Sequence, residues 1–359
     1  MGRLQYVWRS SLAAAHSFLR PPVEQVCRAL LGSWVNVLLL CVPAGLALNY
    51  KSGPALATFV VNLLAAVGLL GLGDLAQECI TSQVGTLYGA LLYISTSNLM
   101  QMVSSIVLLA QDQLNMLRLS LIGSLLANIL LLPALSILYA AFCRRDMAHD
   151  YYITKDHTLL LLLAVSSFLI PTVLDKTTVL PTACNAAVSR LVSVFLMLTY
   201  GAYFSFQLST YRDQFSHFTR ERNERADKLL ISIRVASAIF VVTTALFYFC
   251  VDSVVNSLQE LERDDGMGIG AFTGFILIPI LNCDVAAVEQ AGRSMDLMLM
   301  YTIGKCIQSA LLVAPFLIVV SWGIGMVDLN LSFDLWMVSI LFMSVYAVNT
   351  MVARQSFDW

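Results

Sequence analysis

The feature that most constrains this chain is a series of ten apolar stretches, each close to the length that crosses a lipid bilayer. A helix of about 20 apolar residues spans the hydrocarbon core, where every backbone polar group needs a partner within the protein. The stretches therefore predict an all-α integral membrane protein with about ten transmembrane helices. They cover approximately residues 33–50, 55–73, 86–110, 117–143, 157–174, 186–209, 230–251, 267–292, 295–324 and 331–352.

Composition agrees with this class. Of the 359 residues, 58% are hydrophobic and 12% are charged, whereas a soluble domain carries about 25% charged residues. A net charge of −2 predicts no basic surface for nucleic acid, so the lipid bilayer is the expected partner. The eight cysteines form no CxxC pair or Cys/His cluster, so neither a metal site nor a cofactor is predicted. The N-terminal residues contain no apolar core that ends in a small-residue cleavage site, so no cleavable signal peptide is expected.

The distribution of lysine and arginine predicts the orientation of the helices, because cytoplasmic loops carry an excess of basic residues. With the N-terminus in the cytoplasm, 15 of the 21 basic residues fall in cytoplasmic segments and five fall on the other side. The remaining one, Lys305, lies within a span. This split predicts ten helices with both termini in the cytoplasm.

A polar pattern occurs twice along the chain. In each half, a polar break in one apolar stretch precedes a glycine with a polar neighbour in the next stretch. Gln101 and Ser124 are 23 residues apart, and so are Asn282 and Lys305. Inverted repeats bring such breaks together near the middle of the bilayer, although polar residues can also simply hold helices together. We therefore predict a central cavity lined by Asn98, Gln101, Ser124, Asn128, Asn282, Asp284, Lys305 and Gln308.

The repeats define the expected organisation of the chain. Residues 1–32 are predicted to be a cytoplasmic segment, and residues 33–210 a first helix plus the first repeat. Residues 211–229 alternate acidic and basic side chains, which is typical of a solvated helical linker. Residues 230–359 are predicted to form a second, shortened repeat.

An ordered set of segments resembles the vacuolar calcium/proton exchangers of the cation/calcium exchanger superfamily. These segments are residues 36–43, 120–128, 275–279, 295–297 and 303–317. The resemblance implies two inverted repeats of five helices, an extra N-terminal helix, and a vacuolar or other endomembrane location. It also implies a Gly-Asn-x-x-Glu motif in each repeat, whose two glutamates bind calcium or protons alternately.

The chain departs from that family at both motifs. The first reads Ser97-Asn98-Leu99-Met100-Gln101, with glutamine at the glutamate position. The second glutamate position holds Ala286 when aligned from Pro279, or Asn282 when aligned from Met295. An amide can neither carry a charge nor release a proton. The chain also ends about where the family begins its last helix, so that helix is expected to be missing.

Two charges accompany the altered motifs. Asp284 follows the second polar break, and Lys305 lies on the next apolar stretch. An unpaired charge inside a membrane costs several kcal/mol, so these groups are expected to pair or to become neutral. They are interpreted either as a structural ion pair or as an acid–base pair that lines a cavity.

Three functions remain open at this point. The first is a divergent transporter of a cation, a proton or another solute, without ordinary calcium/proton exchange. The second is a membrane enzyme, such as a cyclase or isomerase of specialised metabolism, acting on an apolar small molecule. The third is a non-transporting partner protein. The retained architecture favours the transporter, and a wet cavity around Asp284 and Lys305 would fit the first two.

Overall fold

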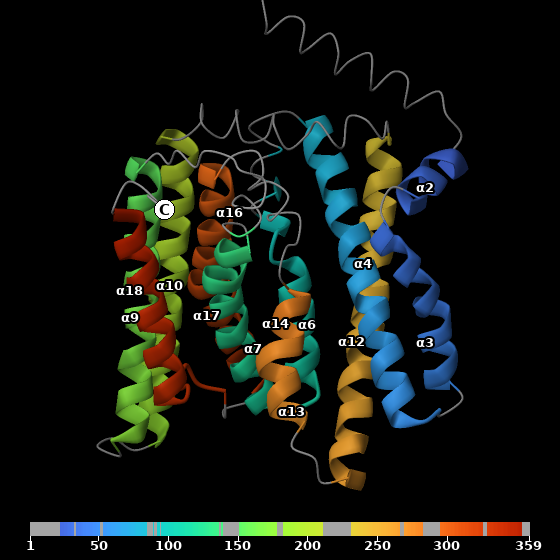
Figure 1. The fold of residues 1–359 in the computed structure, drawn as a ribbon. Coiled ribbons are helices and arrows are strands. Elements are labelled where there is room, and N and C mark those ends of the chain that lie inside the picture. Colours follow the sequence, from blue (N-terminus) through green and yellow to red (C-terminus); the bar gives the residue numbers. More distant parts are fainter. Residues whose placement is uncertain are drawn as a thin grey trace, which may run out of the picture. The chain divides into compact units, whose positions relative to one another are not determined.

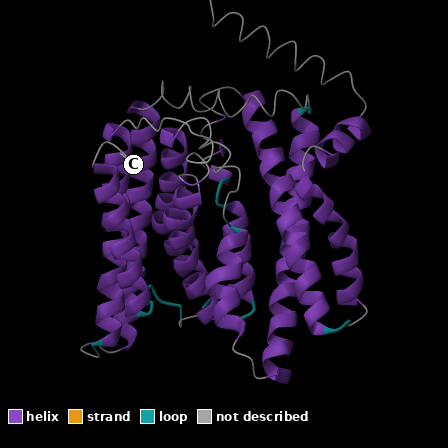
Figure 2. Ribbon diagram, in the orientation of Figure 1, coloured by secondary structure: helices purple, strands orange, loops and turns teal. Residues whose placement is uncertain are grey.

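The computed structural model describes residues 22–31, 34–50, 53–84, 89, 92–93, 95–135, 138, 151–177, 182–210, 231–265, 269–282, 295–325 and 329–353. These described residues form helices and turns and contain no strand (Figures 1 and 2). In chain order the helices are α2 (Pro22–Leu31), the 3-10 helix η1 (Trp34–Leu40), α3 (Cys41–Tyr50), α4 (Ala55–Val84), α6 (Leu99–Ala110), α7 (Leu114–Leu126), the π-helix η2 (Ala127–Leu131), α9 (Tyr151–Lys176), α10 (Thr182–Thr210), α12 (Ile233–Asp265), α13 (Ile269–Phe272), the π-helix η3 (Thr273–Leu277), α14 (Ile278–Leu281), α16 (Met295–Gln308), the π-helix η4 (Ser309–Val313), α17 (Ala314–Ile324) and α18 (Leu335–Ala353).

The helices confirm the membrane class. Six of the described segments are long and apolar enough to cross a bilayer, and four shorter segments are also apolar. The six are Ala55–Val84, Leu114–Leu135, His157–Lys176, Cys184–Phe206, Ile233–Arg263 and Thr302–Ile324. The four are Asn36–Tyr50, Leu99–Ala110, Gly270–Leu281 and Leu335–Thr350. Each predicted apolar stretch overlaps one of these segments, so the chain is an all-α, multi-pass integral membrane protein. The number of crossings remains a prediction.

Two helices extend further than their apolar stretches predict. α4 has 30 residues and α12 has 33, where stretches ending at residues 73 and 251 were expected. The apolar stretch predicts too early an end for α4, because the helix continues into polar residues that hydropathy alone assigns to a loop. The fold instead buries Gln77 and Glu78 inside the protein, each 4% exposed, so the helix continues through them.

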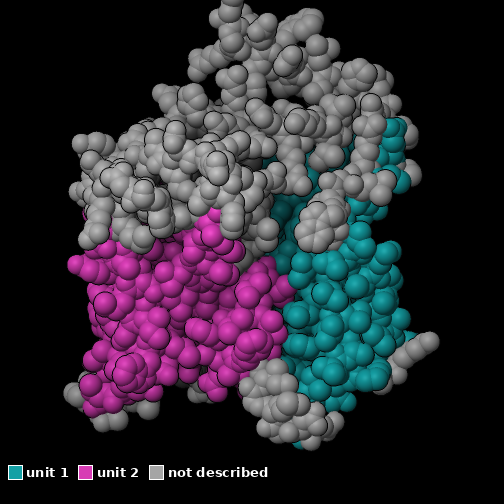
Figure 3. Space-filling view, viewed as in Figure 1, with its two compact units in different colours: residues 1–107, 209–270 teal, residues 108–208, 271–359 magenta. Residues whose placement is uncertain are grey.

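The helices pack into two compact units (Figure 3). Unit 1 draws on residues 1–107 and 209–270, and unit 2 draws on residues 108–208 and 271–359. Each unit therefore combines helices from both halves of the chain. These two units do not coincide with the two successive repeats predicted from the sequence. The repeats therefore stay a prediction.

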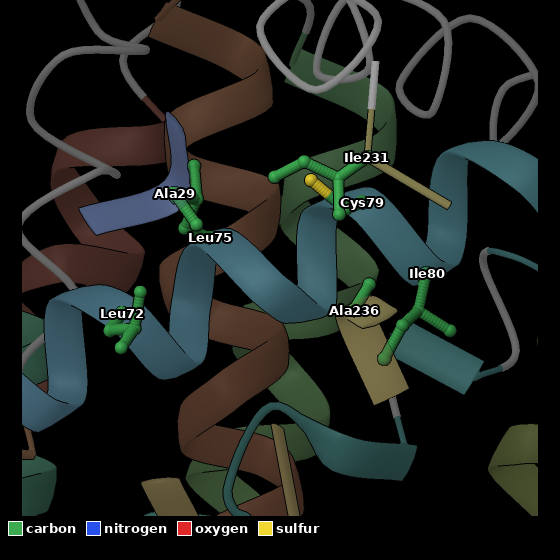
Figure 4. Close-up of a cluster of buried hydrophobic side chains, with 7 residues drawn as sticks. All are labelled: Ala29, Leu72, Leu75, Cys79, Ile80, Ile231 and Ala236. Atoms are coloured by element: carbon green, nitrogen blue, oxygen red, sulfur yellow. The ribbon is translucent and has the colours of Figure 1, made fainter. Parts of the chain in front are cut away.

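Unit 1 is built around the contact of α4 with α12, onto which α3 also packs. A cluster of buried side chains joins α2, α4 and the start of α12 at one end, as Figure 4 shows. Its members are Ala29, Leu72, Leu75, Cys79, Ile80, Ile231 and Ala236. Hydrogen bonds hold the same end: the Ser232 N–H donates to Gln25 Oε1 over 2.8 Å, and Gln83 Nε2 donates to the Ile231 carbonyl over 2.6 Å.

Unit 2 contains α7, η2, α9, α10, α16 and α18 with the segment η3–α14. α9 packs against α18 and α16, and α7 packs against η3 and α14. Two hydrogen bonds join α9 to the α18 region. Thr158 Oγ1 donates to Asn349 Oδ1 over 2.8 Å, and Ser332 Oγ donates to Asp175 Oδ2 over 2.6 Å. These bonds fix α18 near both of its ends.

The orientation of the chain leads to a first testable prediction. A glycosylation or fluorescence reporter fused to the C-terminus should be read as cytoplasmic, because positive-inside counting places both termini there. A reporter inserted within residues 211–229 should also be cytoplasmic and serves as the control. A lumenal C-terminal reporter would contradict the ten-helix count, since the eleven helices implied by the resemblance place the C-terminus on the far side.

Candidate functional site

The first predicted polar break is present in unit 1. The Ser97 N–H donates to the Tyr93 carbonyl over 2.9 Å, and a turn at residues 97–98 precedes α6. Asn98 and Gln101, which are 1% and 2% exposed, sit at this turn and in the first turn of α6. Gln77 Nε2 also donates to the Tyr93 carbonyl, over 3.2 Å, so α4 contacts the backbone just before the break. The prediction that this stretch is broken and buries its amides is confirmed.

Five of the other predicted residues lie in unit 2. They are Ser124, Asn128, Asn282, Lys305 and Gln308, which we call the unit 2 polar centre, and none is more than 8% exposed. Asp284, the remaining predicted residue, lies outside the described residues. Burial of one lysine and four other polar side chains in a membrane protein is costly unless they bond within the fold, so their partners decide what this centre can do.

Two contacts bring the helices of the polar centre together. A Cβ atom added to Gly123 on α7 would lie 2.6 Å from Cγ of Pro279, so only glycine permits this approach of α7 to α14. On the other side, Cys306 Sγ of α16 lies 3.9 Å from the Leu125 carbonyl of α7. The turn of α7 that carries Ser124 is therefore held between the α14 segment and the turn of α16 that carries Lys305.

Lys305 binds the backbone at the end of α14. Its Nζ donates to the Asn282 carbonyl oxygen over 3.1 Å. The Asn282 N–H still bonds back to the Ile278 and Pro279 carbonyls, each over 3.1 Å, and Asn282 is the C-cap of this helix. A carbonyl at a helix C-terminus has no partner within its helix and carries part of the negative end of the dipole. The ammonium of Lys305 meets both needs.

Several polar atoms of the unit 2 polar centre lack hydrogen-bond partners. Among the described residues, neither side-chain atom of Asn282 has one, and the same is true of Ser124 Oγ and Asn128 Oδ1. Asn128 Nδ2 does donate to the Ser124 carbonyl over 2.8 Å. Buried polar atoms are nearly always hydrogen-bonded in proteins, so these atoms need partners from outside the described residues, such as water, an ion or another part of the chain.

A π-helical turn follows the polar centre residue in each half of the chain. η2 begins at Ala127, three residues after Ser124, and η4 begins at Ser309, four residues after Lys305. Single π-helical turns within α-helices are often found at functional sites, because they change which carbonyls are bonded. Their matched positions were not visible in the hydrophobic pattern, which does not distinguish π from α turns.

Other buried polar residues, which are not among the predicted cavity residues, also lie near the two polar breaks. In unit 1, Glu78 and Ser105 are 4% and 0% exposed. In unit 2, Thr273 is 0% exposed, and its Oγ1 has no hydrogen-bond partner among the described residues. Glu78 is visible in the sequence, because it resembles one of the paired acidic residues that the exchangers carry before their first motif, but it is not among the predicted cavity residues. Ser105 and Thr273 gave no comparable signal, because hydroxyl groups are common in apolar helices.

The Asn282 carbonyl that Lys305 contacts is a neutral oxygen, as are Ser124 Oγ and Asn128 Oδ1. No group of three His, Cys, Asp or Glu side chains that could hold a metal ion occurs in the part of the chain that the structure describes. Calcium takes about six to eight oxygen ligands, with carboxylates among them. Amide, hydroxyl and backbone oxygens are instead suited to one positive charge, which Lys305 supplies.

Comparison with known proteins identifies related chains. Residues 55–209 match the family described as sodium/calcium exchanger protein. The chain is 29% identical over 339 residues to the vacuolar calcium ion transporter of Schizosaccharomyces pombe, covering 92% of this chain and 81% of that protein. It is 28% identical over 331 residues to vacuolar cation/proton exchanger 2 of Arabidopsis thaliana, covering 88% and 74%.

Solved structures share the fold. Native YfkE matches with a TM-score of 0.74 at 19% sequence identity, over 89% of this chain and 92% of that one. The H⁺/Ca²⁺ exchanger CAX matches with a TM-score of 0.65 at 14% identity, over 93% of this chain and 83% of that one. Similarity at these sequence identities shows a common fold only. Function has to be argued from the residues of the site.

Proposed function

We propose that this chain, whose residues 55–209 match the sodium/calcium exchanger family and whose fold is shared with a solved calcium/proton exchanger, is a divergent transporter that does not perform ordinary calcium/proton exchange. It is a multi-pass membrane protein of the vacuole or another endomembrane, which is supported by relatives named as vacuolar that it matches over 88–92% of its length. Those relatives are named as transporters and exchangers, which supports retaining transport in the proposal. The solute can be a cation, a proton or another small molecule.

One observation gives the main support for the proposed absence of calcium/proton exchange. The Asn282 carbonyl, at the second polar break, accepts a hydrogen bond from the Lys305 ammonium over 3.1 Å. A carbonyl at such a break is a natural ligand for a transported cation, and here it faces a cation that belongs to the protein. A calcium ion brought to the same place would meet the positive charge of the Lys305 ammonium, so its binding would be opposed.

The first polar break supports the same conclusion. The side chain at the motif glutamate position is the amide of Gln101, which is buried and 2% exposed. Its carbonyl oxygen can bind a cation, but the amide cannot release a proton in return. Exchange of calcium for protons needs a group that changes its charge, and Gln101 does not supply one.

Radiolabelled calcium uptake tests the proposal. The purified protein, reconstituted in vesicles with an acidic interior, should show no calcium uptake driven by the pH gradient. The fission yeast relative, prepared in the same way, is the positive control for the vesicles. Uptake above that of empty vesicles, abolished by a protonophore, would contradict the proposal. Gln101→Glu alone should also remain inactive, because the second repeat still lacks a carboxylate at its motif glutamate position.

Transport itself requires a separate measurement. Vesicles that contain a pH-sensitive dye can be exposed to a panel of small cations and neutral solutes, and ion currents can be recorded across the same membranes. At least one solute should produce a flux that empty vesicles lack. A correctly folded protein that moves nothing in this panel would fit the non-transporting partner instead.

A further inference from the structure

We propose that Lys305 is a tethered cation: its ammonium group occupies the place of a free cation in the unit 2 polar centre and so prevents free cations from binding there. The inference deepens the proposed function, on which it rests, by naming a residue that determines specificity. It concerns equilibrium binding to unit 2, whereas the proposed function concerns transport.

The position of the ammonium carries the first step. Nζ of Lys305 lies 3.1 Å from the carbonyl oxygen of Asn282, the C-cap of α14. The free carbonyls at the C-terminus of an interrupted membrane helix bind cations in transporters, because they are unbonded within the helix and stand at the negative end of its dipole. The ammonium therefore lies where the backbone attracts positive charge most strongly.

The neighbouring oxygens carry the second step. Asn282 Oδ1, Ser124 Oγ and Asn128 Oδ1 are buried and have no hydrogen-bond partner among the described residues. The approach of Gly123 to Pro279, and of Cys306 to Leu125, holds Ser124 at the level of Asn282 and Lys305. These three oxygens belong to residues on the helices that meet at Lys305, and each can accept a hydrogen bond or bind a cation.

The third step compares equivalent positions in the two halves of the chain. Lys305 and Ser124 each follow a glycine and each precede a π-helical turn, η4 or η2. At this position a serine offers a hydroxyl oxygen and leaves space, whereas a lysine fills the space and brings its own charge. Replacing lysine by serine should therefore turn the centre into a site for a free cation. Its ligand would be singly charged, such as ammonium or potassium, because it replaces the single charge of the Lys305 ammonium.

Thermal unfolding in detergent tests this inference directly. The variant Lys305→Ser should gain a saturable rise in Tm of about 2–4 °C on titration with ammonium or potassium chloride. Choline chloride at the same ionic strength should give no rise, because its quaternary ammonium is too large for the space that lysine vacates. The wild-type protein should show no saturable response to any of the three salts, since its own ammonium already fills the site.

A matched variant separates the effect of removing the positive charge from the effect of opening space in the site. Lys305→Met keeps an unbranched side chain of similar length without the ammonium, so it should not respond to the salts. No salt-specific rise in a folded Lys305→Ser protein, or an equal rise in the wild type or in Lys305→Met, would overturn the inference. If Lys305→Ser unfolds on extraction, ammonium chloride in the extraction buffer should preserve it. Failure of that rescue while Lys305→Met folds would overturn the inference as well.

The outcome is independent of calcium transport. Wild-type calcium/proton exchange would refute the proposed function whatever the variant binds. Conversely, a Lys305→Ser protein that ignores ammonium and potassium would refute the tethered cation alone, if the wild type also carries no calcium.

Discussion

Lys305→Met and Asp284→Asn should each destabilise the protein by roughly 3–5 kcal/mol, while the double variant should be less destabilised than either. The pairing of these residues is a prediction from the sequence, because Asp284 lies outside the part of the chain that the structure describes. Its basis is that the buried ammonium of Lys305 needs a counter-charge, and Asp284 is two residues from Asn282, whose carbonyl Lys305 contacts. Removing one partner would leave the other buried and uncompensated.

Thermal stability of the three variants in detergent, combined as a double-mutant cycle, measures this coupling. Additive effects of the two single changes would mean that the side chains do not interact. An activity measurement in cells separates the two interpretations of the pair. A structural pair allows the double variant to keep its function, whereas a pair that takes part in transport or catalysis gives a folded double variant without function.

Gly123→Ala should destabilise the protein by about 1–3 kcal/mol, because the added Cβ would overpack the contact between α7 and α14. An ideal Cβ at this position lies 2.6 Å from Cγ of Pro279 and still nearer the Phe275 carbonyl oxygen. One neighbour belongs to the backbone and the other to a rigid ring, so neither can move aside without shifting a helix. The change should also disturb Asn282, one helical turn beyond Pro279.

Gly304→Ala is the matched control for Gly123→Ala. Gly304 holds the corresponding place in the second half of the chain, and none of the described atoms lies within 4 Å of a Cβ built there. Alanine should therefore be neutral or stabilise the helix by about 0.5–1 kcal/mol, through its lower conformational entropy in the unfolded chain. Unfolding temperatures of both variants decide the question. Equal losses would show that the approach of α7 to α14 does not require glycine.

The burial of the first polar break was predictable from local sequence. Asn98 and Gln101 interrupt an apolar stretch, and amides in such a place must face protein or water because lipid offers no hydrogen bonds. The same reasoning indicated that Ser124, Asn128, Asn282, Lys305 and Gln308 avoid lipid, and all five are buried in the structure, whereas the central cavity stays a prediction. It failed at the end of α4, where Gln77 and Glu78 are buried by other helices that hydropathy does not take into account.

The amino-acid sequence by itself determined the membrane class, the apolar segments, and the polar positions that the fold must bury. These follow from the free energy of transferring side chains from water to lipid, which can be summed over each short segment without knowing its neighbours in the fold. Only the tertiary structure decided that Lys305 bonds to the Asn282 carbonyl, and that units 1 and 2 each combine helices from both halves of the chain. Such contacts depend on which helices meet, and that is settled by close packing, such as that at Gly123, between segments more than 150 residues apart.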